Sequence, residues 1–452
     1  MKKVLYLIFV LTLISCRSLE KISRSGKKNV EFPKIAFTGV NIITLTSDFI
    51  LLNQTLLVDD GRIVEFGNTK DLQVPNDYHL IKCDGKYLMP GLIDMHVHIS
   101  DDGDMLKFLK YGVTTVRHMS DVPWWAKFMG FPNILKLKEK QNQEKVFGPD
   151  IYTFGYCLDG KPPVSPMNKK ITDSISARNE VFKEKKNGYD FLKLYDKLSL
   201  TAYTAIINSA KETNMPVGGH VPELVGLDRV LDDHVVSIEH LSGYIDNNTG
   251  DYIIPQNKFD FYLNKTKSSG VYNCPTIVVW DNIPPEKEFD TLLKDPDFKY
   301  LKWHVKWLWK TSLPYYYRNT YPDKLFYTKH MSQISQEFTY KLFLSGCPLL
   351  IGTDANVIGT YVGYSTLREI ELFNKCGIPN FETLKSATIV AATALGLENE
   401  IGTIEKGKKA NLILLNENPL ENIKSIHSLA YVCMGRFLFS KDYIDGLVEQ
   451  YF

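Results

Sequence analysis

The chain has 452 residues, of which 44% are hydrophobic and 23% are charged, so it carries enough apolar material for a large buried core. This composition excludes a disordered tail and a disulfide-stapled miniprotein. The 53 basic residues and 52 acidic residues leave a formal net charge of +1, which gives no electrostatic case for a nucleic-acid partner.

The first 15 residues have the pattern of a secretory leader. Two lysines precede an apolar run over residues 4–14, which is too short to span a bilayer permanently. The sequence LISC at residues 13–16 resembles the bacterial lipobox, which implies that residues 1–15 form a removable signal peptide and that Cys16 is acylated. A simple signal peptide or a buried N-terminal helix is the alternative. We therefore expect an exported, membrane-anchored lipoprotein on the periplasmic or outer-membrane side.

Residues 17–30 are rich in Lys, Arg and Ser, which predicts a flexible tether, so residues 16–34 would link the lipid to the folded part. Export implies an oxidising compartment. The other cysteines show neither a CxxC motif nor framework spacing, so we expect mostly buried thiols, with one incidental disulfide as the alternative. These cysteines are Cys83, Cys157, Cys274, Cys347, Cys376 and Cys433.

Both ends of the remaining chain are rich in short β-runs separated by turn signals. We predict that residues 35–90 and 396–452 pair into one discontinuous domain, a small composite β-sandwich. The predicted strands are Ala36–Ile43, Thr55–Asp59, Gly61–Phe66, Lys86–Leu88, Asn411–Leu415, Ala430–Met434 and Arg436–Phe439.

Between residues 91 and 395, short apolar strands alternate with amphipathic stretches. Eight such strands predict an α/β fold of the closed (β/α)₈ TIM-barrel type. The predicted strands are Leu92–His98, Thr114–Met119, Ile151–Leu158, Phe191–Tyr195, Val217–Val221, Ser237–Leu241, Tyr272–Val279 and Leu349–Ala355. The predicted helices include Asp104–Tyr111, Ala177–Lys186, Leu200–Glu212, Met331–Leu344 and Phe381–Leu395.

The first barrel strand ends in His96-Val97-His98. Residues two apart on a strand face the same way, so both imidazoles should point into the barrel at its C-terminal end. Such a pair is suited to binding a metal ion, although two core histidines with satisfied hydrogen bonds would look the same.

Four more groups able to bind metal stand at other strand ends. Lys193 ends the fourth predicted strand, His220 the fifth, His240 the sixth and Asp354 the eighth. An ammonium pointing into an apolar barrel is costly. A carbamylated lysine avoids that cost, because its two oxygens can bridge two cations. Together with the histidine pair, these positions predict a metal site.

Seven stretches of the chain, in order, resemble the amidohydrolase superfamily, most closely its branch of imidazolonepropionase and related metal-dependent dipeptidases. They are LMPGLIDMHVHIS, YGVTTVRHM, DFLKLYDKLS, PVGGHVPE, SIEHLSGY, LLIGTDAN and IGTIEKGKKANLILLNENPL. The resemblance covers almost all of the chain after the leader and implies a barrel with a composite β-domain. Barrels of this superfamily often form homo-oligomers, although no segment here stands out as an interface.

The resemblance also implies a binuclear site. The first metal would be held by His96, His98, Lys193 and Asp354, and the second by Lys193, His220 and His240, with a hydroxide between the ions. Zinc suits this ligand set, with manganese or iron as alternatives. In the implied hydrolysis, Asp354 takes the proton of the attacking hydroxide and passes it to the leaving amine, with His240 also in the catalytic set.

Several further residues are candidates for contact with a small-molecule substrate. Tyr195 would donate a hydrogen bond to the substrate, or else pack at the barrel rim. His118 and Tyr244 are candidate substrate contacts, although a supporting or surface role is favoured for His118. Glu223 follows His220 at the spacing of a deaminase proton shuttle, but deaminases of the superfamily lack the bridging lysine. Asn411 replaces the aspartate usual in the family's closing motif.

The stretch 280–327 is rich in aromatic residues, including three tryptophans at near-helical spacing. It would form either a lid that recognises apolar groups or a helix packed on the barrel.

Together, these features predict a metal-dependent hydrolase that cleaves a C–N amide bond in a dipeptide or N-acyl amino acid. A cyclic-amide or lactone hydrolase, or a deaminase, on the same scaffold is the alternative. A binding lipoprotein without turnover is disfavoured, because all six ligand positions are filled.

Overall fold

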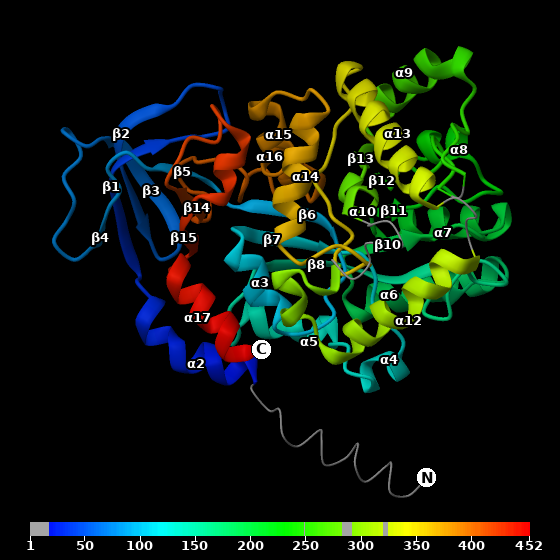
Figure 1. Cartoon of the computed structure of the whole chain (residues 1–452), viewed down its shortest axis with the longest axis horizontal. Helices are drawn as coiled ribbons and strands as arrows, with labels where there is room; N and C mark the ends of the chain where they lie inside the picture. Colours follow the sequence, from blue (N-terminus) through cyan, green and yellow to red (C-terminus); the bar gives the residue numbers. More distant parts are fainter. Residues whose placement is uncertain (1–17, 248, 283–291, 320–323) are drawn as a thin grey trace, which may run out of the picture.

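The computed structural model describes residues 18–452 apart from residues 248, 283–291 and 320–323, and only the backbone of residues 312–319 and 324–328. Figure 1 shows two parts side by side, a β-domain built from both ends of the chain and a larger barrel surrounded by helices. This arrangement confirms the predicted α/β fold with a composite second domain.

Seven parallel strands form most of the barrel, in the order β13-β12-β11-β10-β8-β7-β6. Strands β6 and β7 are buried at every position, as expected for strands covered on both faces. The barrel strands are β6 (Leu92–Val97), β7 (Val113–His118), β8 (Asp150–Asp159), β10 (Phe191–Leu194), β11 (Val217–Gly219), β12 (Ser237–Glu239) and β13 (Tyr272–Cys274), and a short β9 (Lys169–Lys170) pairs with β8.

The eighth predicted strand, Leu349–Ala355, is an extended segment that joins its neighbours through isolated hydrogen bonds. Leu350 N donates to Asn273 O at 2.9 Å, and Met95 N donates to Ile351 O at 2.9 Å, so the segment lies between β13 and β6 and nearly closes the barrel. Gly352 permits this approach, since a Cβ there would lie 2.8 Å from the Cβ of His96.

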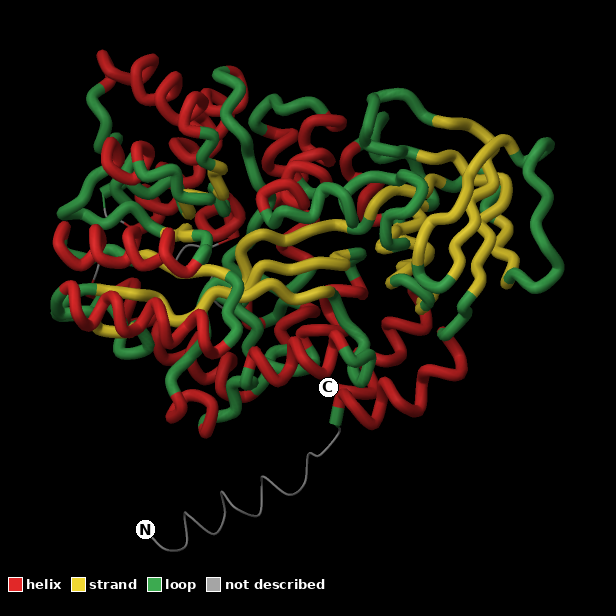
Figure 2. Tube along the Cα trace, turned by 180° about the vertical axis from the view of Figure 1, so that it is seen from behind, coloured by secondary structure: helices red, strands yellow, loops and turns green. Residues whose placement is uncertain are grey.

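Helices cover the outside of the barrel (Figure 2). Two predictions differ from the structure. The strand predicted over Tyr272–Val279 stops at Cys274 and is followed by a helix, and the helix predicted over Phe381–Leu395 is divided in two. The helices are α3 (Asp104–Lys110), α4 (Trp124–Phe128), α5 (Ile134–Asn142), α6 (Ser174–Asn187), α7 (Leu200–Thr213), α8 (Leu227–Asp232), α9 (Phe259–Ser269), α10 (Ile277–Asn282), α12 (Trp303–Asn319), α13 (Lys324–Leu344), α14 (Tyr364–Lys375), α15 (Asn380–Ser386) and α16 (Ile389–Ala394), with 3₁₀ helices η1 (Gln256–Lys258), η3 (Pro296–Tyr300) and η4 (Ile423–His427).

The ends of the helices follow local sequence signals. The Asp173 side chain caps α6 by accepting a hydrogen bond from Ser176 N, and Gly188 ends the helix with φ 89°. Ser199 caps α7 in the same way, and Asn214 ends it in the left-handed conformation. These two helices pack against each other on the barrel, where their caps fix the lengths of the adjoining loops.

The composite domain is one sheet in the order β16-β15-β14-β5-β1-β2-β3, with β4 paired to β1. The predicted sandwich is therefore a single hydrogen-bonded sheet, in which β14 pairs with β5 and joins the two ends of the chain. Its strands are β1 (Lys34–Ile42), β2 (Leu51–Asp59), β3 (Arg62–Asn68), β4 (His79–Lys82), β5 (Tyr87–Pro90), β14 (Asn411–Leu415), β15 (Leu429–Met434) and β16 (Phe437–Ser440).

A helix stands where the sequence predicted a flexible tether. Residues Leu19–Val30 form α2, which buries Leu19, Ile22 and Val30 in the main hydrophobic core. The many charged residues of this segment favoured a linker prediction, but they occupy the polar face of an amphipathic helix whose other face is apolar. It packs near the C-terminal helix α17 (Lys441–Tyr451), so the described fold begins well before the predicted domain boundary at residue 35.

The six cysteines between Cys83 and Cys433 are free thiols, and all but Cys376 are buried. Cys16 and the predicted signal peptide lie outside the described residues. Within the parts of the chain that the structure describes, none of the helices has the length and apolar character needed to cross a membrane.

Candidate active site

The predicted metal ligands converge at the C-terminal ends of the barrel strands. His96 lies near the end of β6 and His98 just beyond it, while Lys193 lies within β10. The remaining three follow directly on barrel segments: His220 after β11, His240 after β12, and Asp354 in the extended segment that closes the barrel. This end of a parallel barrel is where the active sites of such folds are built.

Asp354 stands at the centre of a cluster of imidazoles. Its Oδ1 lies 3.3 Å from His96 Nε2 and 3.0 Å from His98 Nε2, and its Oδ2 lies 4.0 Å from His240 Nε2. The ring centroids of His240 and His220 are 5.0 Å apart, so His220 continues the cluster on the far side. The period-two placement of His96 and His98 therefore brings both Nε2 atoms to the same carboxylate.

Each of the four histidines has its Nδ1 in a hydrogen bond with a neighbour. These contacts leave every Nε2 atom available to the shared space, which is the arrangement expected of histidines that bind a metal. The Nδ1 partners are Glu239 Oε2 for His96 (2.7 Å), Ser120 Oγ for His98 (3.2 Å), Asp196 Oδ1 for His220 (2.7 Å) and Thr276 Oγ1 for His240 (2.7 Å).

Lys193 is 1% exposed and lies close enough to His96 and His240 to lower the pKa of both imidazoles. Gly219, with φ 132°, makes room for it, since a Cβ there would lie 3.1 Å from Lys193 Cδ and 2.4 Å from Leu194 O. A buried lysine of this kind needs either an anionic partner or a change in its own charge. The structure thus places Lys193 with the histidines that the sequence grouped it with.

Burial makes the imidazoles good ligands. It lowers the pKa of His96, helped by the nearby Lys193, and holds the pKa of His240 well below its usual range. Burial would raise the pKa of the Asp354 carboxyl, but the neighbouring His96 and His240 hold it well below its usual range. At neutral pH His96 and His240 therefore offer neutral imidazoles and Asp354 a carboxylate, the forms that bind a divalent metal.

The backbone around the cluster adopts conformations that L residues rarely take. His240, Thr276 and Asp354 have φ of 57°, 51° and 54°. Such left-handed residues carry a cost of about 1–3 kcal/mol each and concentrate at functional sites. Here they turn the side chains of His240 and Asp354 into the cluster immediately after the regular barrel segments end.

A buried ion pair between Glu239 and Arg117 holds the His96 ring in place. The sequence did not predict it. Glu239 Oε1 lies 2.7 Å from Arg117 Nη2, while its Oε2 contacts His96, and both charged side chains are fully buried. Burial would raise the pKa of Glu239, but Arg117 and His96 hold it well below its usual range. The sequence signal for this pair was one charged residue in each of two apolar strands, Arg117 in VTTVRHM and Glu239 in VSIEHL.

Two of the candidate substrate contacts adjoin the cluster. The Tyr195 ring stacks on His220 with centroids 4.2 Å apart, and burial raises the pKa of its phenol, so it remains a hydrogen-bond donor. His118 is buried beside His98, and its Nδ1 accepts a hydrogen bond from Ile99 N at 3.0 Å. Burial lowers the pKa of His118 to about 3, so its neutral ring carries the proton on Nε2.

Other candidates are placed elsewhere. Tyr244 is fully buried among core residues, where its hydroxyl lies 2.7 Å from Thr266 Oγ1 and its ring packs on Phe338, so it does not line the site. Tyr244 was a candidate because it follows the His240 strand, but the chain turns into the core after that strand and carries Tyr244 away from the site. Glu223 is exposed and pairs with Lys197 Nζ at 2.6 Å, rather than facing the imidazoles.

The aromatic stretch contributes a packed helix. Trp309 of α12 is fully buried and donates a hydrogen bond at 3.3 Å to the carbonyl oxygen of Asn356, two residues after Asp354. Trp303 and Trp307 point outward instead. The side chains of Tyr315, Tyr316, Tyr317, Arg318 and Tyr321 lie outside the described residues.

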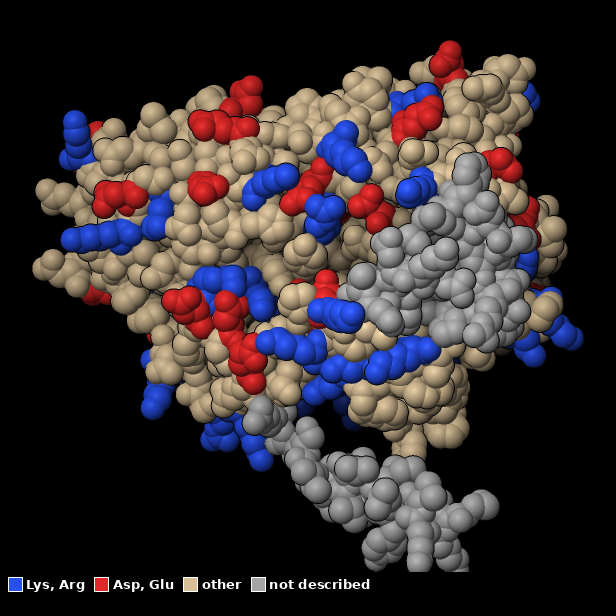
Figure 3. All heavy atoms as spheres, viewed as in Figure 1, with Lys and Arg blue, Asp and Glu red and all other residues tan. Residues whose placement is uncertain are grey.

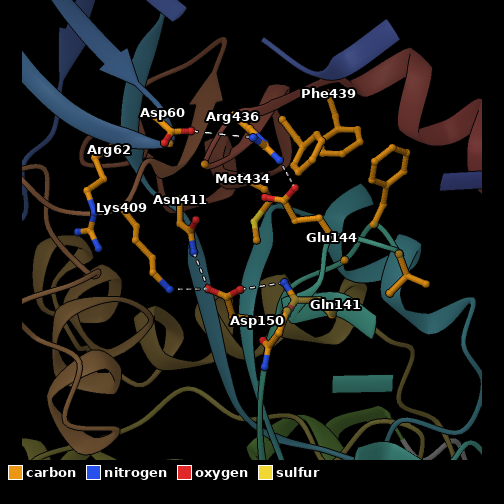
Figure 4. A pocket seen from close by; sticks show the side chains of 17 residues that line it. Asp60, Arg62, Gln141, Glu144, Asp150, Lys409, Asn411, Met434, Arg436 and Phe439 are labelled. Atoms are coloured by element: carbon orange, nitrogen blue, oxygen red, sulfur yellow. Dashed lines mark hydrogen bonds and ion pairs between the residues drawn. The ribbon is translucent and has the colours of Figure 1, made fainter. Parts of the chain in front are cut away.

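A cavity of about 460 Å³ lies between the composite sheet and the barrel, and none of the predicted ligands lines it (Figure 4). Asp150 faces it and accepts hydrogen bonds from Gln141 Nε2 at 2.9 Å and Asn411 Nδ2 at 3.2 Å. This contact explains why Asn411 replaces the usual aspartate, because a carboxylate there would repel Asp150. The position helps join the two domains and has no direct role in the metal cluster.

Residues 339–435 match the model of the Amidohydrolase family. Among curated proteins, an adenine deaminase of Clostridium perfringens is 26% identical over 192 residues, which cover 39% of this chain and 31% of that protein. An imidazolonepropionase of Vibrio cholerae is 50% identical over 46 residues, 10% of this chain and 11% of that protein. The chain thus aligns with about a third or less of these two relatives.

Two solved structures share the fold over nearly the whole chain. A Bifidobacterium longum protein assigned as a prolidase has a TM-score of 0.69 at 23% identity and covers 93% of this chain and 99% of its own. A bottromycin amidohydrolase has a TM-score of 0.74 at 20% identity and covers 95% of this chain and 91% of its own. At 20–23% identity these similarities show a shared fold, and the match to the family model covers residues 339–435.

Proposed function

We propose that this protein is a metal-dependent hydrolase that cleaves a C–N amide bond in a dipeptide or an N-acyl amino acid. The observation that carries the proposal is the meeting of three imidazole Nε2 atoms at the Asp354 carboxylate, with the buried Lys193 near His96 and His240. Histidines whose Nδ1 atoms are already hydrogen-bonded have few uses in such a cluster other than ligation.

The residues present fit a divalent metal. Ligand atoms of His96, His98 and Asp354 all lie within 4.8 Å of one another. His240, His220 and Lys193 extend this set, so that two ions, for which zinc is the proposed identity, could share a carbamylated Lys193. A metal held there would supply a nucleophile at neutral pH by lowering the pKa of water, and it would polarise the substrate carbonyl.

The chain's own residues then have distinct tasks. The Asp354 carboxylate accepts a proton from the attacking water as the new C–O bond forms, and it passes that proton to the nitrogen as the C–N bond breaks. Tyr195 donates a hydrogen bond from its phenol to the carbonyl oxygen or to a substrate carboxylate. His118, protonated on Nε2, offers a second neutral donor beside His98. Glu239 keeps the His96 ring in one orientation.

The structural similarity to a protein assigned as a prolidase favours a dipeptide, while the adenine deaminase relative favours deamination as the second candidate. Glu223 weighs against the deaminase. A proton shuttle must reach the substrate, whereas Glu223 is exposed and paired with Lys197. A cyclic-amide hydrolase would share all of the metal-binding residues and would differ only in the pocket.

The first test is metal content by mass spectrometry on the full chain purified with bicarbonate, with Lys193→Ala beside it. The proposal expects about two metals per chain, and fewer in the variant. One metal, unchanged by Lys193→Ala, would contradict the bridged site and favour the deaminase. Screening dipeptides and N-acyl amino acids follows, with Glu223→Gln as a discriminator: the amidase keeps its activity in this variant, whereas a deaminase that uses Glu223 loses it.

The proposed location is a membrane surface, reached through an acylated Cys16 after removal of residues 1–15. Support comes only from the leader and lipobox-like sequence. Mass spectrometry of the N-terminal peptide from the native host should show a diacylglyceryl cysteine. In a Cys16→Ser variant the modification should be lost and the leader retained. An unmodified Cys16 in the mature protein would contradict this proposal.

A further inference from the structure

Large apolar side chains are exposed on two neighbouring helices at the mouth of the barrel. On α4 and just after it, Trp124, Phe128 and Met129 are exposed, with Phe128 90% accessible. On α12, Trp303 and Trp307 are 65% and 53% exposed. Exposed Trp and Phe side chains gathered in this way mark interaction surfaces, since single ones are the norm.

The end of α4 touches the start of α12, and we call the exposed apolar side chains of the two helices the aromatic patch. It comprises Trp124, Phe128, Met129, Trp303, Trp307 and Leu308. The His304 ring, at the start of α12, lies with its centroid 4.8 Å from that of Phe131, just after α4. His304 Nε2 also donates to Ser100 O at 3.1 Å, two residues beyond His98. The patch is therefore fixed beside the candidate active site.

Packing of α12 does not account for its outward tryptophans. Val305 and Trp309, four residues apart, turn inward and are buried in a small core with Tyr361. Trp303 and Trp307 have the same spacing and face away from it, toward solvent. The inner face alone is enough to hold the helix on the barrel, so the outer face is available to a partner.

Lysines line one side of the aromatic patch. Lys306 and Lys310 form no ion pair among the described residues: Lys306 Nζ donates to Lys299 O at 2.9 Å, and both ammonium groups lie over the Phe298 ring, with their charge balanced by no carboxylate. Figure 3 shows basic side chains in a row above an uncharged bulge at the lower right, where Figure 1 places α4 and the start of α12. The surface thus combines an apolar centre with a cationic edge.

We propose that the aromatic patch docks on a lipid bilayer that contains anionic lipids. Trp and Phe insert favourably at the bilayer interface, and nearby lysines add electrostatic attraction to anionic headgroups. Helix α4 and the start of α2 lie at the same lower edge of the molecule in Figures 1 and 2, so one flat surface could touch both. The barrel mouth then opens next to the membrane. This inference does not depend on acylation of Cys16.

The experiment uses the full chain with an environment-sensitive NBD label on a single introduced cysteine. Phe128→Cys places the label in the aromatic patch. Phe261→Cys is the matched control: Phe261 is 57% exposed and lies on α9, at the opposite, upper edge of Figure 1. Both carry Cys376→Ser, because Cys376 is the one partly exposed thiol among the free cysteines described. The label is read with vesicles of phosphatidylethanolamine and phosphatidylglycerol, and with phosphatidylcholine vesicles.

We expect NBD emission at position 128 to rise about twofold or more with the anionic vesicles, and at position 261 to stay unchanged. Lys306→Gln with Lys310→Gln should reduce the rise, as should high salt. If the protein co-floats with the vesicles in a density gradient but neither label changes its emission, the N-terminus alone holds the protein on the membrane. That result overturns the proposal. A rise at position 128 that follows protein concentration without vesicles would show a second copy on the patch, and would overturn it equally.

Discussion

His96 Nδ1 lies 2.7 Å from Oε2 of Glu239, the residue directly before His240 in the chain. Because an ionised carboxylate only accepts hydrogen bonds, this contact places the His96 proton on Nδ1 and leaves Nε2 with its lone pair toward Asp354. Arg117 keeps Glu239 ionised from the other side. One buried pair thereby orients a candidate ligand and braces the strand that carries another.

Replacing Glu239 by Gln should weaken metal binding more than it perturbs the fold. The amide keeps the size of the side chain but removes the charge that holds the His96 tautomer, so we expect about a 10–100-fold loss of metal affinity. A competition titration with a chromogenic chelator measures this change. Glu369→Gln is the control, since Glu369 is equally buried but bonds to the N terminus of α10. Equal metal affinity in wild type and Glu239→Gln would refute the orienting role.

The predictable part of the site came from local periodicity. His96 and His98 are two residues apart on one strand, so their shared direction follows from the strand itself. Lys193, His220 and His240 were placed by the rule that active sites occupy one end of a parallel barrel. Such arguments need only the strands to be recognised, and the structure brings these side chains together as expected.

What the sequence did not reveal depends on contacts between distant residues. Glu239 and Arg117 are 122 positions apart, and nothing in either strand alone names the other as its partner. The segment Leu349–Ala355 looks like a strand because it is apolar, but only isolated bridges form there. In α2, tertiary burial of Leu19, Ile22 and Val30 overrides a composition typical of a linker.

Asp354→Asn should reduce turnover far more than metal content. The amide can still coordinate through its oxygen, but it cannot take and return a proton, so we expect a loss of about 10²–10⁴-fold in kcat with most of the metal retained. Metal analysis and steady-state kinetics on the same preparation give both numbers. Asp228→Asn, at an exposed ion pair with Lys265, should change neither. Full activity in Asp354→Asn would rule out the proton-transfer role.

Tyr195→Phe should separate catalysis from packing. Loss of a hydrogen bond to the substrate predicts about a 10²-fold decrease in kcat/KM, with the stacking on His220 preserved. Tyr244→Phe is the matched control, because that hydroxyl contacts Thr266 in the core. It should affect thermal stability and leave kcat/KM unchanged. If Tyr195→Phe behaves like the control, Tyr195 is a packing residue of the barrel rim.

Glu369 on α14 should make the stability of the fold depend on pH. Burial raises its pKa from 4.5 to about 8, and the amides of Ile277 and Val278 offset this only in part. The folded chain therefore holds a proton that the unfolded chain releases between about pH 4.5 and 8. This contribution to the free energy of unfolding is complete below pH 4.5, and it is lost as the pH rises through 8.

The slope from this one proton is at most about 1.4 kcal/mol per pH unit. Glu369→Gln cannot ionise, so its urea midpoint should fall less steeply than that of the wild type between pH 5 and 8. Glu382→Gln, at a partly exposed pair with Lys385 on α15, should keep the wild-type slope. Parallel curves for Glu369→Gln and the wild type would mean that Glu369 is already ionised in the fold at pH 5, held by its two backbone donors.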